Sequence, residues 1–130
     1  MTLSGKYKLI RDEGQYEHLI ANGMPEDRAK AFIEGGMSYE ILISGNDVTL
    51  VGSNGRTQKY VLGQETTQTT PDGKIMKNTA SLDANILTVE TKFEKGTMKR
   101  VFSLSGSELI VLSVSDKPGI PDGKRIYEKV

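Results

Sequence analysis

The sequence predicts an all-β fold: a ten-stranded antiparallel up-and-down β-barrel of the clam type, with a helix-turn-helix lid between the first two strands. Two observations lead to this prediction. From Met37 onward, apolar or alternating segments of about six to nine residues are separated by short clusters of Gly, Asn, Asp and Pro. Between Tyr16 and Glu34, in contrast, the apolar residues recur at helical spacing.

The expected strands are bounded by turn-forming residues. The first strand is expected at residues 6–11 and the last at 124–129. Between them we expect eight strands, at residues 37–44, 47–53, 56–62, 64–70, 74–82, 86–93, 97–104 and 108–115. The breaks between them are Gly45-Asn46-Asp47, Asn54-Gly55, Leu62-Gly63, Pro71-Asp72-Gly73, Asp83-Ala84-Asn85, Glu94-Lys95-Gly96 and Ser105-Gly106-Ser107. Asn, Asp and Gly suit such turns because they tolerate a positive φ.

The helical region is expected to form two short helices within about residues 15–35. Its apolar residues fall at spacings of three and four, and they are Tyr16, Leu19, Ile20, Met24, Ala29, Phe32 and Ile33. Gly23 interrupts the pattern, Pro25 stands where a second helix would begin, and Gly35-Gly36 ends it. This pattern predicts a helical pair inserted between the first and second strands.

Ten consecutive strands must hide their edges, and short turns between them favour a closed barrel. The segment 64–70 is polar on both faces, and a dry core could not hydrogen-bond such side chains. The sequence therefore predicts a barrel with a hydrated interior, formed by a single domain over residues 1–130.

Composition and charge exclude several classes of function. Seventeen Lys and Arg balance seventeen Asp and Glu, so no net field attracts nucleic acid. The chain has no Cys and one His, His18, which excludes disulfides, thiolate catalysis and Cys- or His-rich metal centres. No apolar stretch approaches the roughly 20 residues of a membrane span, and the first residues lack a secretory signal pattern. We expect a cytoplasmic protein without metal or other cofactor.

The strand at 124–129 carries an arginine and a tyrosine on one face. Alternation places Arg125 and Tyr127 together, opposite Lys124, Ile126 and Glu128. The burial preferences of these residue types alone favour Ile126 as the inward residue. If Arg125 instead points inward, its guanidinium needs a partner, and a ligand carboxylate fits it with two charge-assisted hydrogen bonds.

Three motifs occur in a familiar order. Gly5-Lys6-Tyr7-Lys8-Leu9 is followed by Tyr16-Glu17-His18-Leu19-Ile20; Leu62-Gly63-Gln64-Glu65 is followed by Thr70-Pro71-Asp72-Gly73-Lys74; and the chain closes with Lys124-Arg125-Ile126-Tyr127-Glu128-Lys129. Together they resemble, over the whole chain, the intracellular lipid-binding proteins, which include the fatty-acid-binding and cellular retinoid-binding proteins. The resemblance implies a ten-stranded barrel with a helical lid over a large water-filled cavity. It also implies non-catalytic carriage of a long-chain fatty acid, with a retinoid or bile acid as the alternative ligand.

The same resemblance implies where a ligand carboxylate is held. The family's terminal Arg and Tyr fall on Arg125 and Tyr127, and its second arginine falls on Arg100, with Phe102 as the alternative counterpart. Three departures accompany the match. One extra residue separates Leu9 from Tyr16, the segment before Arg56 is short, and the loop Asp116 to Gly123 is long.

Other residues are expected to line the cavity and its portal. Alternation places Met37, Tyr39, Ile41 and Ile43 on one face of their strand, and Leu87, Val89, Thr91 and Phe93 on one face of theirs. With the portal residues that the resemblance implies, the predicted lining is Tyr16, Met24, Phe32, Ile33, Met37, Tyr39, Ile41, Leu50, Tyr60, Met76, Val89 and Phe102. Any one of them also suits ordinary core packing, so ligand contact is predicted for the set.

Two other classes of function stay open. An enzyme needs a nucleophile and a base, but His18 and Glu17 are sequence neighbours on a predicted helix, and His18 is expected to be a solvated surface residue. A barrel without ligand could act as a protein interaction or regulatory module. A secreted lipocalin fits poorly, because ten strands, a helical pair and no Cys are expected. We expect a monomer with at most transient membrane contact, since Arg28 and Lys30 are nearly cancelled by nearby acids.

Overall fold

The computed structural model describes residues 3–35, 37–53, 57–69, 73–93, 96–117 and 119–130. Its strands are β1 (Gly5–Glu13), β2 (Ser38–Ser44), β3 (Asp47–Gly52), β4 (Thr57–Val61), β5 (Glu65–Thr69), β6 (Ile75–Asp83), β7 (Ile86–Phe93), β8 (Gly96–Ser105), β9 (Glu108–Ser115) and β10 (Gly123–Lys129). The two helices, α1 (Gln15–Ala21) and α2 (Glu26–Gly35), follow β1.

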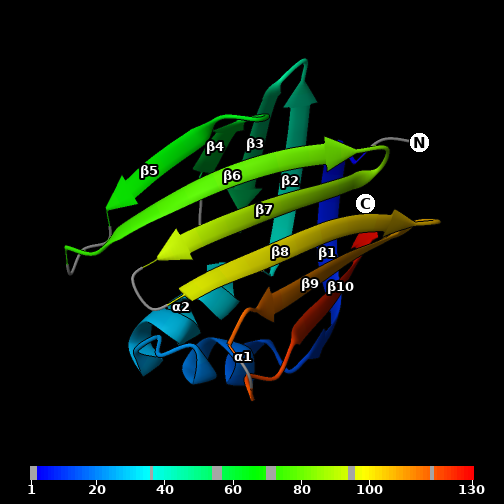
Figure 1. Ribbon diagram of the computed structural model, residues 1–130. Helices are drawn as coiled ribbons and strands as arrows, with labels where there is room; N and C mark the ends of the chain where they lie inside the picture. The colour runs from blue at the N-terminus through cyan, green and yellow to red at the C-terminus, as the bar shows by residue number, and fades with distance from the viewer. Residues whose placement is uncertain (1–2, 36, 54–56, 70–72, 94–95, 118) are drawn as a thin grey trace.

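The strands form one antiparallel sheet in the order β4-β3-β2-β1-β10-β9-β8-β7-β6-β5. The sheet curls so that β1–β4 run across β5–β9, which gives two facing layers (Figure 1). β4 and β5 are the two ends of this order, and a hydrogen bond from Gly63 N to Ala80 O, 3.0 Å, ties the turn between them to β6. The all-β clam predicted from the sequence is thus confirmed.

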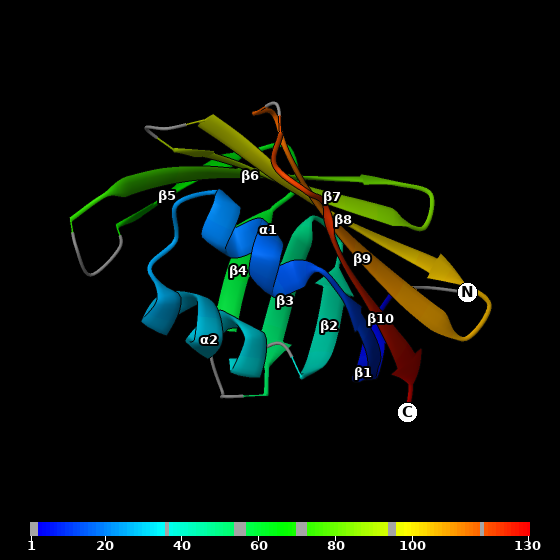
Figure 2. The same ribbon diagram turned by 90° about the horizontal axis from the view of Figure 1, so that it is seen from below.

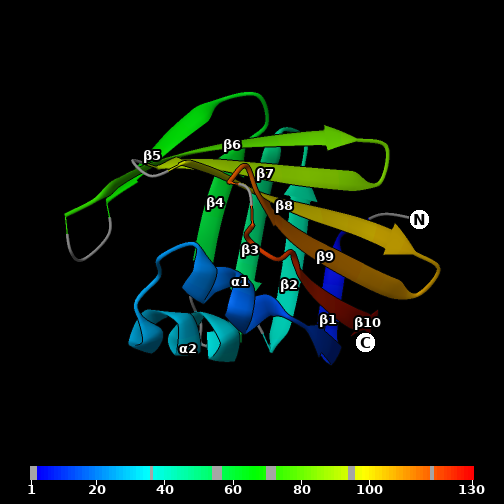
Figure 3. The ribbon, with the colours of Figure 1, turned by 60° about the horizontal axis from the view of Figure 1, so that its bottom comes forward.

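The helices close one end of the barrel. Seen from below, α1 and α2 lie side by side across one end of the two layers (Figure 2), and the tilted view shows the pair beneath β2–β4 and β7–β9 (Figure 3). Gly23 adopts a φ of 90° between them, and this left-handed conformation lets the chain reverse there. The predicted helix-turn-helix lid is therefore confirmed.

The interior between the layers holds the hydrophobic core. Alternation along β7 buries Leu87, Val89 and Thr91 and leaves Thr88 and Glu90 half-buried. The buried core cluster comprises Leu3, Tyr7, Ile41, Val48, Leu50, Tyr60, Ala80, Leu87, Val89, Phe102, Leu109, Val111 and Tyr127. The core is thus built from inward faces of strands in both layers.

Several expected features lie outside the described residues. They are the turns at Asn54-Gly55, Pro71-Asp72 and Glu94-Lys95, with Gly36, Arg56 and Thr70 at the ends of predicted elements. The other predicted turns are present, and Gly45, Gly73 and Gly106 take the positive φ expected of turn glycines.

Candidate functional site

Arg125 and Tyr127 both point into the barrel from β10. Arg125 is 3% exposed, and Tyr127 is fully buried within the core cluster. Ile126, the residue expected inward from burial preferences alone, is also buried, beside Ile110 of β9 and Arg11 of β1 in the sheet register. The inward face of β10 therefore brings a cation and a phenol into an apolar interior.

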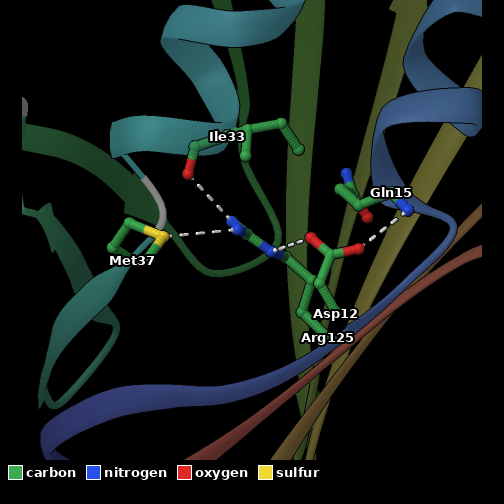
Figure 4. Close-up of polar contacts among 5 residues, drawn as sticks. All are labelled: Asp12, Gln15, Ile33, Met37 and Arg125. Carbon is green, nitrogen blue, oxygen red and sulfur yellow. Dashed lines mark hydrogen bonds and ion pairs between the residues drawn. The ribbon is translucent and has the colours of Figure 1, made fainter.

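The Arg125 guanidinium contacts three segments of the protein (Figure 4). Its Nε donates to Asp12 Oδ2 at 2.8 Å, its Nη1 donates to the Ile33 carbonyl at 3.3 Å, and its Nη2 lies 3.8 Å from Met37 Sδ. The buried charge is thus paired with a carboxylate at the end of β1 and bonded to the C-terminal turn of α2. The sequence predicted a ligand carboxylate as the partner of Arg125. In this structure the side chain of Asp12 provides a carboxylate.

Asp12 was not predicted as a site residue. Leu9 pairs with Tyr127, Arg11 with Ile126 and Asp12 with Arg125, so Ile10 is an extra residue that shifts the register of β1. Without this bulge, the alternation set by Tyr7 and Leu9 would have put Arg11 on the inward face and Asp12 outside. The extra residue noted between Leu9 and Tyr16 was the available signal.

Tyr127 is held among aromatic rings. Its ring centroid lies 5.5 Å from that of Tyr39, which in turn lies 6.5 Å from that of Phe102, both in edge-to-face geometry. Burial, and then the neighbouring Tyr39, raise the pKa of the Tyr127 hydroxyl above its ordinary value, while the charge of Arg125 and a hydrogen bond with it act in the opposite direction. Tyr127 therefore stays a neutral hydroxyl beside Arg125.

Arg100 forms a second cationic site on β8. It is 9% exposed, and its Nη2 lies 3.2 Å from Gln58 Oε1 and 3.3 Å from the Tyr60 hydroxyl oxygen. Its Cζ lies 5.8 Å from the Phe32 ring centroid of α2 and 5.7 Å from that of Phe102. Among the described residues, no acidic side chain pairs with Arg100.

Further polar side chains extend from the second site across the interior. Ser113, opposite Arg100 in the register of β9, is buried, and its Oγ has no hydrogen-bond partner among the described residues. Buried Thr91 donates to Asn78 Oδ1 at 2.7 Å, and Asn78 Nδ2 donates to Gln68 Oε1 at 2.9 Å. The inner wall thus carries polar side chains among its apolar residues on β6, β7 and β9 as well as Arg100 on β8.

The predicted lining residues divide by burial. Ile41, Leu50, Tyr60, Val89 and Phe102 are buried, whereas Tyr16, Met24, Phe32, Ile33, Tyr39 and Met76 are half-buried. Arg100 and Phe102, the two alternatives for the second arginine position, both lie inward.

Met37 differs from its prediction as an inward strand residue. It precedes β2 and is 50% exposed, because the strand begins one residue later at Ser38. Its sulfur lies 3.8 Å from Nη2 of the buried Arg125.

A pocket of about 100 Å³ opens between the lid and one end of β6–β8. Leu19 and Met24 line it from the helices, and Met76, Phe93 and Met98 line it from the strands. Its lining is mainly apolar, and Arg28 and Lys74 also border it. The lid is thus bordered by a mainly apolar pocket.

The prediction of a solvated His18 is wrong. Its side chain is fully buried between α1 and the start of β10. Nδ1 lies 2.8 Å from the Pro121 carbonyl oxygen, which can only accept, so Nδ1 carries the proton, and Nε2 accepts from Asn22 Nδ2 at 3.2 Å. His18 therefore links the lid to the loop before β10, and both of its ring nitrogens are hydrogen-bonded within the protein.

The described residues contain no group of three or more His, Cys, Asp or Glu side chains placed to hold a metal ion. Neither of the described helices is long and apolar enough to cross a bilayer.

Comparisons with known proteins agree with this architecture, although no protein-family model matches the chain. A liver-type fatty-acid-binding protein of Takifugu rubripes is 28% identical over 119 residues, 89% of this chain and 92% of the relative. A fatty-acid-binding protein from Drosophila melanogaster brain superposes with a TM-score of 0.80 at 26% identity, over 98% of this chain and 99% of that one. The fatty-acid-binding protein of Manduca sexta has the same fold, with a TM-score of 0.80 at 21% identity and coverage of 98% and 99%. The sequence match and the shared fold together confirm the predicted resemblance to the intracellular lipid-binding proteins.

Proposed function

We propose that this protein is a non-catalytic carrier that binds a hydrophobic carboxylic acid, first of all a long-chain fatty acid, inside its barrel. The acid head is held by Arg100, Arg125 and Tyr127, and the tail lies among the apolar and aromatic lining residues. The carrier works as a monomer in the cytoplasm. The names of the Takifugu, Drosophila and Manduca relatives support this ligand class.

The proposal rests on the observation that Arg100 is buried without an acidic partner among the described residues. A guanidinium stays protonated at any physiological pH, and burying it without an anion is costly. Its described partners, Gln58, Tyr60, Phe32 and Phe102, are all neutral. A ligand carboxylate would supply the missing charge, and the Ser113 hydroxyl opposite can donate to the same anion.

The test is displacement of a fluorescent fatty acid by a long-chain acid, its methyl ester, retinoic acid and a bile salt. The acid is expected to displace the probe better than its methyl ester does, because the ester brings no charge to the arginines. If only retinoic acid or only the bile salt displaces the probe, that compound and not the fatty acid represents the ligand class of the protein. Failure of every competitor and of the probe to bind would leave the scaffold role as the better account.

Variants then test the charge recognition. Arg100→Gln and Arg125→Gln are each expected to weaken binding of the acid about tenfold or more, as removal of one nearby opposite charge does, with little change for the ester. Lys99→Gln is the matched control, since Lys99 lies next to Arg100 on the exposed face of β8. Equal losses for acid and ester would contradict recognition of the charge.

A further inference from the structure

The Arg125 guanidinium is already neutralised by the protein itself. A guanidinium has five N–H donors, and the structure directs three of its nitrogens to internal acceptors, with Asp12 Oδ2 nearest at 2.8 Å. Arg100 has no such acid among the described residues. The two arginines of the proposed site are therefore unequal: one is paired with an acid of the chain, and the other is not.

Asp12 is placed to compete with a ligand. It lies next to the last residue of β1, just before the lid, and about a third of its side chain (32%) is exposed, whereas the Arg125 side chain is 3% exposed. Its second oxygen, Oδ1, accepts from the backbone N–H of Gln15, the first residue of α1, at 3.2 Å. Asp12 thus forms an ion pair with Arg125 and accepts a hydrogen bond from the lid (Figure 4).

We infer that Asp12 is a specificity-determining residue of the barrel: it acts as the internal counter-ion of Arg125 and lowers the affinity for acids relative to neutral lipids. This inference rests on the proposed binding of a carboxylate at Arg125. An incoming carboxylate must displace the Asp12 carboxylate or lie beside it, and two like charges at one cation repel. A neutral ester meets no such repulsion.

Asp12 also links head-group binding to the lid. An acid that takes the guanidinium from Asp12 competes as well for the N–H that Arg125 donates to the Ile33 carbonyl of α2. The competition therefore reaches both helices, α1 through Gln15 and α2 through Ile33.

The test is the ratio of acid to methyl-ester affinity in Asp12→Asn. The variant removes the charge and keeps an oxygen that can accept from the Gln15 N–H. We expect the ratio to rise about tenfold, because one like charge near the bound carboxylate is gone. Glu13→Gln is the matched control: Glu13 is the next residue, its side chain is 49% exposed and it pairs with Arg11 at 3.3 Å. Its ratio is expected to stay unchanged.

A second variant and a double variant keep the inference testable. Asp12→Ser also removes the charge and retains an acceptor for Gln15, so it should raise the ratio even if Asp12→Asn folds poorly. In the Arg125→Gln background, Asp12→Asn should raise the ratio less than it does in the wild-type background, because the cation for which Asp12 and the ligand compete is absent. An unchanged ratio in both single variants, in a protein whose wild type binds the acid, would overturn the role of Asp12 and leave the carrier function standing. If the wild type does not bind the acid, the carrier function itself is overturned.

Discussion

The two inward arginines are stabilised by different means. Arg125 has a carboxylate within hydrogen-bond distance, so its burial resembles an ordinary ion pair that is costly to break by removing one member. Arg100 instead has two neutral oxygen partners and two aromatic rings, which solvate the cation without cancelling its charge. Within the described part of the chain, the surplus positive charge of the interior therefore resides at Arg100.

Gly123 allows the lid to approach β10. A Cβ at this position would lie 2.6 Å from Gln15 Oε1, 2.9 Å from Gln15 Cα and 3.1 Å from His18 Cβ. We expect Gly123→Ala to lower the free energy of unfolding by about 1–3 kcal/mol, since the helix backbone must move to relieve the overlap. Urea denaturation measures the change. Lys124→Ala, at the next and half-buried position, is the control and should change the free energy of unfolding by no more than about 0.5 kcal/mol. An unchanged urea midpoint in Gly123→Ala would show that α1 can shift freely.

At this scale the sequence predicted the inward placement of some residues and missed that of others. Alternation placed Arg125 and Tyr127 on one face, and the family resemblance chose the inward orientation that the structure has. Asp12 was missed because its contact with Arg125 joins segments 113 residues apart and depends on a one-residue bulge. His18 was misjudged because its burial comes from the loop before β10, which no local pattern in α1 reveals.

The strands and helices were predictable almost entirely from local signals. The bounds of β7 and β9 coincide with the predicted segments 86–93 and 108–115, because alternating residues run directly into turn residues at both ends. Both helices fall within the expected range because Gly23 and Pro25 separate two short amphipathic segments. The up-and-down pairing order was also predicted, from the short turns between consecutive strands, whereas the bulge in β1 depends on its pairing with the distant β10 and was not predicted.

The turn between β6 and β7 contains a strained alanine. Ala84 has a φ of 54°, and a non-glycine residue in this left-handed region pays about 1–2 kcal/mol. Glycine avoids that strain but loses about 0.5–1 kcal/mol more conformational entropy on folding. We expect Ala84→Gly to raise the free energy of unfolding by about 0.5–1 kcal/mol, measured by urea denaturation.

Ala31→Gly is the control for this turn. Ala31 is exposed on α2, where the same exchange should cost about 1 kcal/mol because glycine is a poor helix former. The two changes should therefore have opposite signs. A loss of stability in Ala84→Gly would mean that the alanine methyl group contributes more than its backbone strain costs.

The molecule as a whole should lose stability in alkali. Burial raises the pKa of Tyr7, and burial with Tyr39 nearby raises the pKa of Tyr127, from the ordinary value of 10.0. Below about pH 10 both residues are neutral in the folded and unfolded chains, so they add no pH dependence. Above it the unfolded chain releases protons that the folded barrel retains, and the free energy of unfolding falls as the pH rises.

Urea denaturation between about pH 8 and pH 11 tests this expectation. In Tyr127→Phe the free energy of unfolding should fall less steeply with pH than in the wild type. The variant lacks one hydroxyl that ionises more readily in the unfolded chain than in the folded barrel. Tyr16→Phe, at a half-buried position of α1, serves as the comparison for loss of a hydroxyl elsewhere. Identical slopes for the wild type and Tyr127→Phe would contradict a neutral, buried Tyr127.

The pairing of β1 with β10 affects the order in which the protein can form during synthesis. β1 lies between β2 and β10 in the sheet, and the backbone of Val130 bonds to that of Lys6. One edge of β1 therefore has no partner until the ribosome has released residues 123–129. Such distant pairing slows folding, and the nascent chain must keep its apolar inner face from aggregating until then.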